Sequence, residues 1–140
     1  MYNSGARLSK TKEASDIAIK LYKKICNTRG DCYWVSKWTN FSIEQCNAVK
    51  NYAFRDSHNL SYGYEPFLPD YAMAMSWLRL SSSDVNKILK HDSLLVYHEF
   101  TELMYLLNNP KMKIEQAHEL ARQKYDYDIA VKVYEATFNI

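Results

Sequence analysis

Residues 94–107 read LLVYHEFTELMYLL, an apolar run interrupted mainly by two carboxylates and an imidazole. Such a run is predicted to form a helix, on which His98 and Glu102 lie one turn apart on the same side and Glu99 lies beside them. Because Leu95 shares this side, we expect it to face the protein interior rather than water. The stretch therefore predicts a largely buried helix that carries a polar cluster.

A turn follows this helix and sends the chain back. Pro110 and the two asparagines before it end the helix, and residues 114–125 have the apolar spacing of a second long helix. Helices folded back about such a turn form an antiparallel hairpin, in which residues equidistant from the turn come level. Glu102 lies eight residues before the proline and His118 eight residues after it. The spacing therefore predicts that Glu102 and His118 are neighbours, with His98 one helical turn further along.

The rest of the chain predicts an all-α fold, a single compact multi-helix domain at residues 11–140 with this hairpin at its centre. Residues 1–10 are predicted to be a flexible leader. A capping box begins at Ser42. Further helices are predicted at residues 12–27, 43–55, 71–80, 84–90 and 129–138. Residues 32–38 fit either a strand or a helical turn, with their tryptophans buried, and residues 56–69 are predicted to be a long loop.

The composition is that of one globular domain. A chain of 140 residues with 47% hydrophobic residues suffices for one core. The net charge of +2 does not by itself indicate nucleic-acid binding, although basic residues gather near the N-terminus. No apolar run approaches the roughly 20 residues of a membrane span, and the first residues lack the apolar part of an export signal. Cys26, Cys32 and Cys46 suit neither a disulfide framework nor a zinc ribbon, so we expect reduced thiols.

The hairpin brings together residue types that bind divalent metals. His98, Glu102 and His118 supply two imidazoles and a carboxylate, which suits zinc or another divalent ion, and Glu99 lies beside them as a candidate general base. The pattern differs from the HExxH motif of metallopeptidases, because residue 102 is glutamate and the second histidine comes later. These residues predict a hydrolase that a metal would assist, and a zinc metallopeptidase-like enzyme is an alternative to a nuclease.

The same residues also allow catalysis without a metal. A histidine oriented by a carboxylate is a general acid or base, and Arg79 or Lys50 would stabilise the charge that develops during phosphoryl transfer, as a nuclease requires. In that case Tyr52, Tyr125 or Tyr127 would hold the substrate.

A non-enzymatic alternative assigns the polar cluster a structural role. His98, Glu102 and His118 would then satisfy one another and Arg79 inside the core, fixing the helix register of a module that binds a protein partner. His58 is a candidate only because it lies in the predicted long loop.

Several short motifs in order suggest a family. They are VKNYAFRDSH at residues 49–58, Pro-Asp at 69–70, SWLRL at 76–80, DSLLVYHEFTE at 92–102, Ala-His at 117–118 and Tyr-Asp-Tyr at 125–127. Their order and spacing resemble those of C-terminal toxin domains of bacterial polymorphic toxins and related prophage-encoded proteins. The resemblance extends over about residues 43–128. This chain departs from the family pattern at Tyr52, where a histidine is expected, and at Asp126, where an asparagine is expected.

The resemblance implies an effector that a larger secreted or phage-borne polypeptide delivers into the cytoplasm of a target cell, with a dedicated immunity protein as partner. It also implies a shared set of site residues. This set comprises His58, Arg79, His98, Glu99, Glu102 and His118. Nucleic acid, RNA or DNA, is the expected substrate, because basic residues gather near the N-terminus and aromatic residues are abundant.

Overall fold

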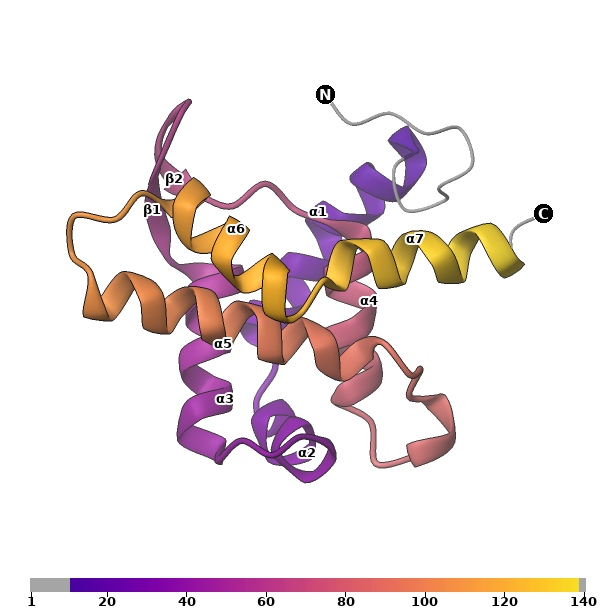
Figure 1. Ribbon diagram of the computed structural model, residues 1–140. Helices are drawn as coiled ribbons and strands as arrows, with labels where there is room; N and C mark the ends of the chain where they lie inside the picture. The colour runs from indigo at the N-terminus through magenta and orange to yellow at the C-terminus, as the bar shows by residue number, and fades with distance from the viewer. Residues whose placement is uncertain (1–10, 139–140) are drawn as a thin grey trace.

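The computed structural model describes residues 11–138, and seven α-helices account for most of this part of the chain. It confirms the prediction of a compact, mostly α-helical domain (Figure 1). The helices are α1 (Lys12–Asn27), α2 (Asp31–Trp38), α3 (Ile43–Lys50), α4 (Tyr71–Leu80), α5 (Asp92–Asn108), α6 (Ile114–Lys124) and α7 (Tyr127–Phe138). None of the helices within residues 11–138 has both the length and the apolar character that crossing a membrane requires.

Side-chain caps explain where several helices begin. Ser42 and Gln45 form the predicted capping box at the start of α3. Thr11 accepts a hydrogen bond from the backbone of Ala14, and Asp70 accepts one from Met73, so α1 and α4 begin at the next residue in each case. These local contacts satisfy backbone N–H groups that lack a partner within the helix.

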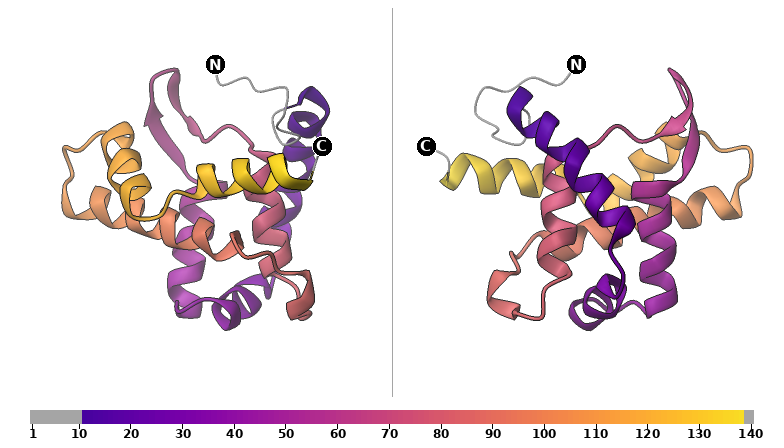
Figure 2. Two further views of the ribbon diagram at one scale, coloured as in Figure 1. Left: turned by 45° about the vertical axis from the view of Figure 1, so that its right-hand side comes forward. Right: turned by 180° about the vertical axis from the view of Figure 1, so that it is seen from behind.

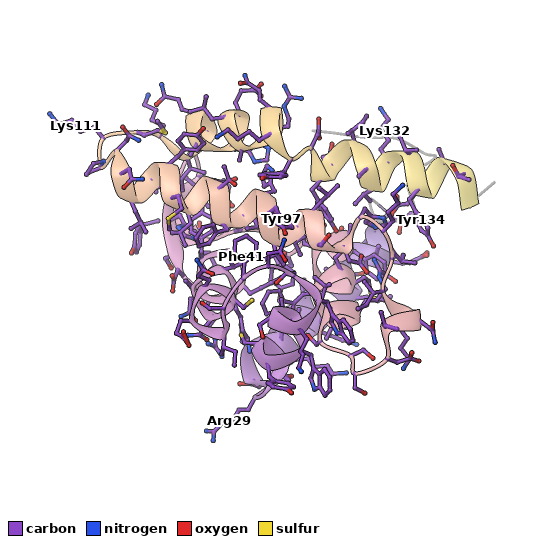
Figure 3. The ribbon with its side chains drawn as sticks, turned by 60° about the horizontal axis from the view of Figure 1, so that its bottom comes forward. Arg29, Phe41, Tyr97, Lys111, Lys132 and Tyr134 are labelled. Atoms are coloured by element: carbon purple, nitrogen blue, oxygen red, sulfur yellow. The ribbon has the colours of Figure 1, made fainter. Side chains whose placement is uncertain are left out.

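The core forms around α4, whose Trp77 is completely buried. Ile25 of α1, Val35 of α2, Val49 of α3 and Leu95 of α5 belong to the same hydrophobic cluster. Seen from behind, α1 crosses α4 (Figure 2). On another side, Phe41 before α3 packs against Tyr97 of α5, with ring centroids 4.9 Å apart (Figure 3). The buried face of α5 is thereby fixed against the rest of the domain.

After α5 the chain turns, and α6 lies against α5 (Figure 1). The buried residues of α6 are Ala117 and Ala121. Because alanine side chains are small, the α6 backbone can approach α5 closely. This close approach places His118 beside α5.

The segment on either side of α3 differs from the prediction in several details. Residues 32–38 lie in α2, and Trp34 and Trp38 are half-buried rather than buried. Trp38 keeps its indole N–H at the edge of the core because it donates to the carbonyl of Ser82, at 2.8 Å. After α3 the helix continues as a π-helical turn, Asn51–Arg55.

The predicted loop at residues 56–69 contains a two-stranded antiparallel hairpin. Its strands are β1 (Ser57–Leu60) and β2 (Gly63–Pro66), and Gly63 has a φ of 133°, which few other residues adopt. The predicted helix at 84–90 is only a 3₁₀ turn, Val85–Lys87. The predicted leader at residues 1–10 lies outside the described residues.

Candidate metal centre

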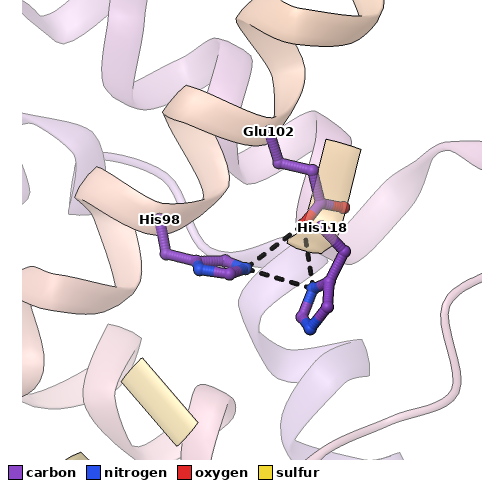
Figure 4. Close-up of side chains that lie close together, drawn as sticks. All are labelled: His98, Glu102 and His118. Carbon is purple, nitrogen blue, oxygen red and sulfur yellow. Dashed lines mark hydrogen bonds and ion pairs between the residues drawn. The ribbon is translucent and has the colours of Figure 1, made fainter. Parts of the chain in front are cut away.

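Three side chains from α5 and α6 meet at one point. His98 and Glu102 lie one turn apart on α5, and His118 comes from α6 (Figure 4). His98 Nε2 lies 3.2 Å from Glu102 Oε2 and 3.2 Å from His118 Nδ1, and His118 Nδ1 lies 3.2 Å from Glu102 Oε2. The contact between Glu102 and His118 that the spacing predicted is therefore present.

The size of this triangle fits a bound metal ion. Two ligand atoms about 2.05 Å from one tetrahedral ion lie about 3.3 Å apart. The three observed separations of 3.2 Å match this value within about 0.1 Å. His98, Glu102 and His118 therefore form a group that could hold a metal ion.

The orientation of His98 is set by a backbone carbonyl. Its Nδ1 lies 2.9 Å from the carbonyl oxygen of Tyr125. A carbonyl can only accept, so Nδ1 carries a proton and the neutral ring has its lone pair on Nε2, directed toward Glu102 and His118. A hydrogen bond from the second imidazole nitrogen to a carbonyl is the usual support of a metal-binding histidine.

Glu102 is supported in a comparable way by Tyr52. The hydroxyl of Tyr52 donates to Glu102 Oε1 at 2.5 Å, which leaves Oε2 for the triangle. Burial alone would raise the pKa of Glu102, but hydrogen bonds from His118 Nδ1 and the Tyr52 hydroxyl help to lower it to about 2. Tyr52 belongs to the π-helical turn, a feature that is often found at functional sites.

His118 is the accessible member of the group. Its side chain is 54% exposed, whereas those of His98 and Glu102 are 6% and 4% exposed. The hydrogen bond to Glu102 raises the pKa of His118 despite the opposing effect of burial. In the metal-free protein a proton on His118 Nδ1 therefore lies between the three side chains, where a bound cation would lie.

Glu99 lies next to the triangle and is buried. Its Oε2 is 3.7 Å from His98 Nε2. Burial raises the pKa of Glu99 well above its ordinary value, and the charges of Glu102 and Asp70 raise it further. Two neighbouring glutamates thus have pKa values pushed in opposite directions, an arrangement that is typical of acid–base sites.

A cavity of about 270 Å³ opens beside these side chains. His98, Glu99 and His118 line it, together with residues from the ends of α4, α6 and α7. Larger hollows elsewhere on the described surface lack this group of ligands. A substrate in this cavity would lie directly against the triangle and Glu99.

His58, predicted as a supporting residue, lies behind Tyr52 rather than in the cavity. Its Nε2 is 2.8 Å from the carbonyl oxygen of Tyr52, and its ring stacks on Phe67 with centroids 4.3 Å apart. His58 therefore contacts the residue that supports Glu102, but not the triangle itself.

The structure does not bring Arg79 or Lys50 to the triangle. Arg79 forms two hydrogen bonds of 2.8 Å with Asp92, which is completely buried and needs a cationic partner. Lys50 is buried as well and forms an ion pair with Asp31 at 2.8 Å. Arg79 therefore does not pair with the polar cluster, contrary to the expectation of the non-enzymatic alternative, and both cations belong to contacts between helices. Stabilisation of substrate charge by either residue is not supported by their positions.

Some contributions to the site are absent from the sequence pattern. The supporting hydrogen bonds come from a tyrosine 50 residues before Glu102 and from a carbonyl 27 residues after His98. The sequence predicts Tyr52 only as a substrate-binding residue, and no sequence signal identifies Glu102 as its partner.

Comparison with known protein families, with curated proteins and with solved structures gives no match. The chemistry of the site therefore rests on its own geometry. That geometry comprises three converging ligand atoms, two supporting hydrogen bonds and a buried carboxyl group beside a cavity. Such a site can bind a divalent ion and move a proton near it.

Proposed function

We propose that this protein is a metal-dependent hydrolase whose divalent ion is held by His98, Glu102 and His118. The observation that carries the proposal is the triangle of ligand atoms, 3.2 Å on each side, at the wall of a cavity. Two imidazoles and one carboxylate form a ligand set of hydrolytic zinc sites, which keep the fourth position open. Zinc is therefore the ion that we propose.

Glu99 is proposed to transfer the proton. A bound ion lowers the pKa of a coordinated water and polarises the bond under attack. Glu99 lies close enough to this position for a dication to favour its ionised form. Glu99 then takes a proton from the attacking water and passes it to the leaving group, so that one water is consumed for each bond broken.

The toxin resemblance supports a place for this hydrolase in a secreted or phage-borne effector. Such an effector would act in the cytoplasm of a target cell and be held inactive by an immunity protein. The basic N-terminal part of the chain supports nucleic acid as the substrate, whereas the ligand set supports a peptide. The reaction proposed for the site is the same in both cases.

Metal analysis tests the site directly. We expect the purified protein to bind about one equivalent of Zn²⁺ and to lose it to a chelator, and we expect His98→Ala to abolish tight binding. His91→Asn is the matched control, since His91 precedes α5 at its N-cap and asparagine is favoured there. Equal Zn²⁺ binding by the native protein and His98→Ala would contradict the ligand assignment.

Expression in bacterial cells tests the activity. We expect the native chain to arrest growth, with degradation of RNA, DNA or protein that His98→Ala and Glu102→Ala both prevent. If both variants kept full toxicity and lost only thermal stability, the hydrolase proposal would fail. That result would favour the non-enzymatic module, in which the polar cluster only fixes the helix register.

A further inference from the structure

The wall of the cavity beside the metal centre carries more negative than positive side chains. Asp70, Asp126 and Asp128 line it in addition to Glu99. Arg122 is the one lysine or arginine in the part of the lining that the structure describes. The cavity thus differs from sites for polyanions, where basic groups predominate.

Arg122 is itself paired with carboxylates. Its guanidinium contacts Asp126 at 3.1 Å and Glu119 at 2.5 Å. Its positive charge is therefore largely balanced by its own two partners.

A bound ion does not reverse the excess of negative over positive charge at the cavity. Among the lining residues and the three ligands, a divalent ion and Arg122 supply three positive charges, whereas the carboxylates of Glu99, Glu102, Asp70, Asp126 and Asp128 supply five negative charges. The cavity volume of about 270 Å³ is also below the roughly 300–1,000 Å³ of sites for drug-sized ligands. One side chain fits this space better than a nucleotide with its phosphate.

We infer that the cavity takes a positively charged side chain and thereby presents a neighbouring peptide bond to the metal centre, so that the substrate is a basic peptide rather than a nucleic acid. This inference rests on the proposed hydrolase function and assigns its substrate class. A peptide carbonyl is neutral, so it can approach the metal centre without repulsion from the aspartates. A phosphodiester brings its own negative charge into the same cavity.

Binding of small molecules tests the charge preference without requiring turnover. L-Arginine amide and inorganic phosphate are titrated separately into the Zn²⁺-loaded protein, and the histidine resonances are followed by NMR. We expect arginine amide to bind at least about tenfold more tightly than phosphate, a difference of about 1.4 kcal/mol. Equal affinities, or tighter binding of phosphate, would overturn the inference.

A variant tests the source of the preference. Asp128→Asn should weaken the binding of arginine amide about threefold to tenfold, the effect of losing one partly screened charge. Asp16→Asn, on the exposed face of α1, is the matched control and should leave binding unchanged. An unchanged affinity for arginine amide in Asp128→Asn would contradict the inference that the aspartates determine the charge preference.

Hydrolysis separates this inference from the proposed function. The Zn²⁺-loaded protein is incubated with paired peptides that contain arginine or glutamate at one position, and with RNA and DNA. We expect kcat/KM to be at least about tenfold higher for the arginine peptide. Cleavage of nucleic acid alone would support the hydrolase function and refute a basic peptide as substrate. Tight binding of arginine amide without any hydrolysis would support the preference for a positively charged ligand and refute the hydrolase function. Binding of two Zn²⁺ ions per chain would also refute the inference, because the second ion would occupy the carboxylates.

Discussion

Tyr52 shows how a single residue can support a candidate metal site without contributing a ligand atom to it. It is buried, and its hydroxyl donates to Glu102 Oε1 at 2.5 Å. This bond fixes the carboxylate so that Oε2 points at His98 and His118. Tyr52 is therefore a positioning residue in the proposed site.

Replacing Tyr52 with phenylalanine tests this role. We expect Tyr52→Phe to weaken Zn²⁺ binding about 10-fold to 100-fold, the usual effect of removing a hydrogen bond to a metal ligand. Competition with a coloured chelator measures the dissociation constant, and circular dichroism checks the fold. Tyr64→Phe, at an exposed position in β2, is the control. An unchanged dissociation constant in Tyr52→Phe would mean that Glu102 is held by other contacts.

Glu99 should make the stability of the metal-free protein depend on pH. Because burial raises the folded-state pKa of Glu99 above its ordinary value of 4.5, the unfolded chain releases this proton first as the pH rises. The free energy of unfolding therefore falls from about pH 4.5 upward until Glu99 itself ionises. Glu102 contributes in the opposite direction, since its lowered pKa gives stability that is lost as the pH falls toward 2.

The difference between Glu99→Gln and the native protein isolates this effect. We expect Glu99→Gln to have the higher Tm at pH 7, by about 4 °C, which corresponds to about 1 kcal/mol in a domain of this length. The difference should shrink as the pH is lowered to 4. Thermal unfolding in the presence of a chelator measures the Tm of the variant and of the native protein at each pH. A Tm difference that did not change with pH would contradict the expected ionisation.

Helix α6 is the more weakly held of the two helices that form the site. Its fully buried residues are two alanines, Ala117 and Ala121, so α6 gains little free energy from apolar burial. By contrast, α5 contributes Leu95 and Val96 to the core and carries two of the three ligands. A metal ion would therefore link a helix with little apolar burial to a helix that contributes to the core.

Hydrogen exchange should reveal this difference. We expect the amides of α6 to exchange faster than those of α5 in the metal-free protein and to slow by about tenfold or more when Zn²⁺ is added. The amides of α3, which carries none of the three ligands, serve as the internal control and should change less. Equal protection of α6 with and without Zn²⁺ would show that the ion does not link the two helices.

At the scale of the whole molecule, a ligand that binds only the folded state raises the free energy of unfolding. Zn²⁺ at about 100 times its dissociation constant should add about 2.7 kcal/mol. The increase should diminish as the pH falls, because the ion has to displace the proton from His118, whose pKa is raised by Glu102. The ion therefore binds more strongly as the pH rises, until the pH exceeds the pKa of His118.

Thermal unfolding at pH 5 and pH 8 checks this expectation. The rise in Tm on adding Zn²⁺ should be larger at pH 8, and His118→Ala should remove most of it at both pH values. A rise of the same size at both pH values would place the ion away from His118.

Most of the helices and the central contact of the site could be predicted from the sequence alone. Apolar spacing and caps placed α1, α3, α4, α5 and α6 within a few residues of their observed positions, because these signals act over a single helical turn. Glu102 and His118 could be paired because both lie near one turn, where the chain leaves few ways to fold back.

The groups from distant parts of the chain that complete the site could be identified only from the packing of the helices. It placed Tyr52 against Glu102 and the carbonyl of Tyr125 against His98, and it directed Arg79 to Asp92 instead. It also brought Asp70 and Asp128 together at the cavity. These contacts depend on how helices far apart in the chain pack around the core, and the packing of complementary side chains leaves no periodic signal in the sequence.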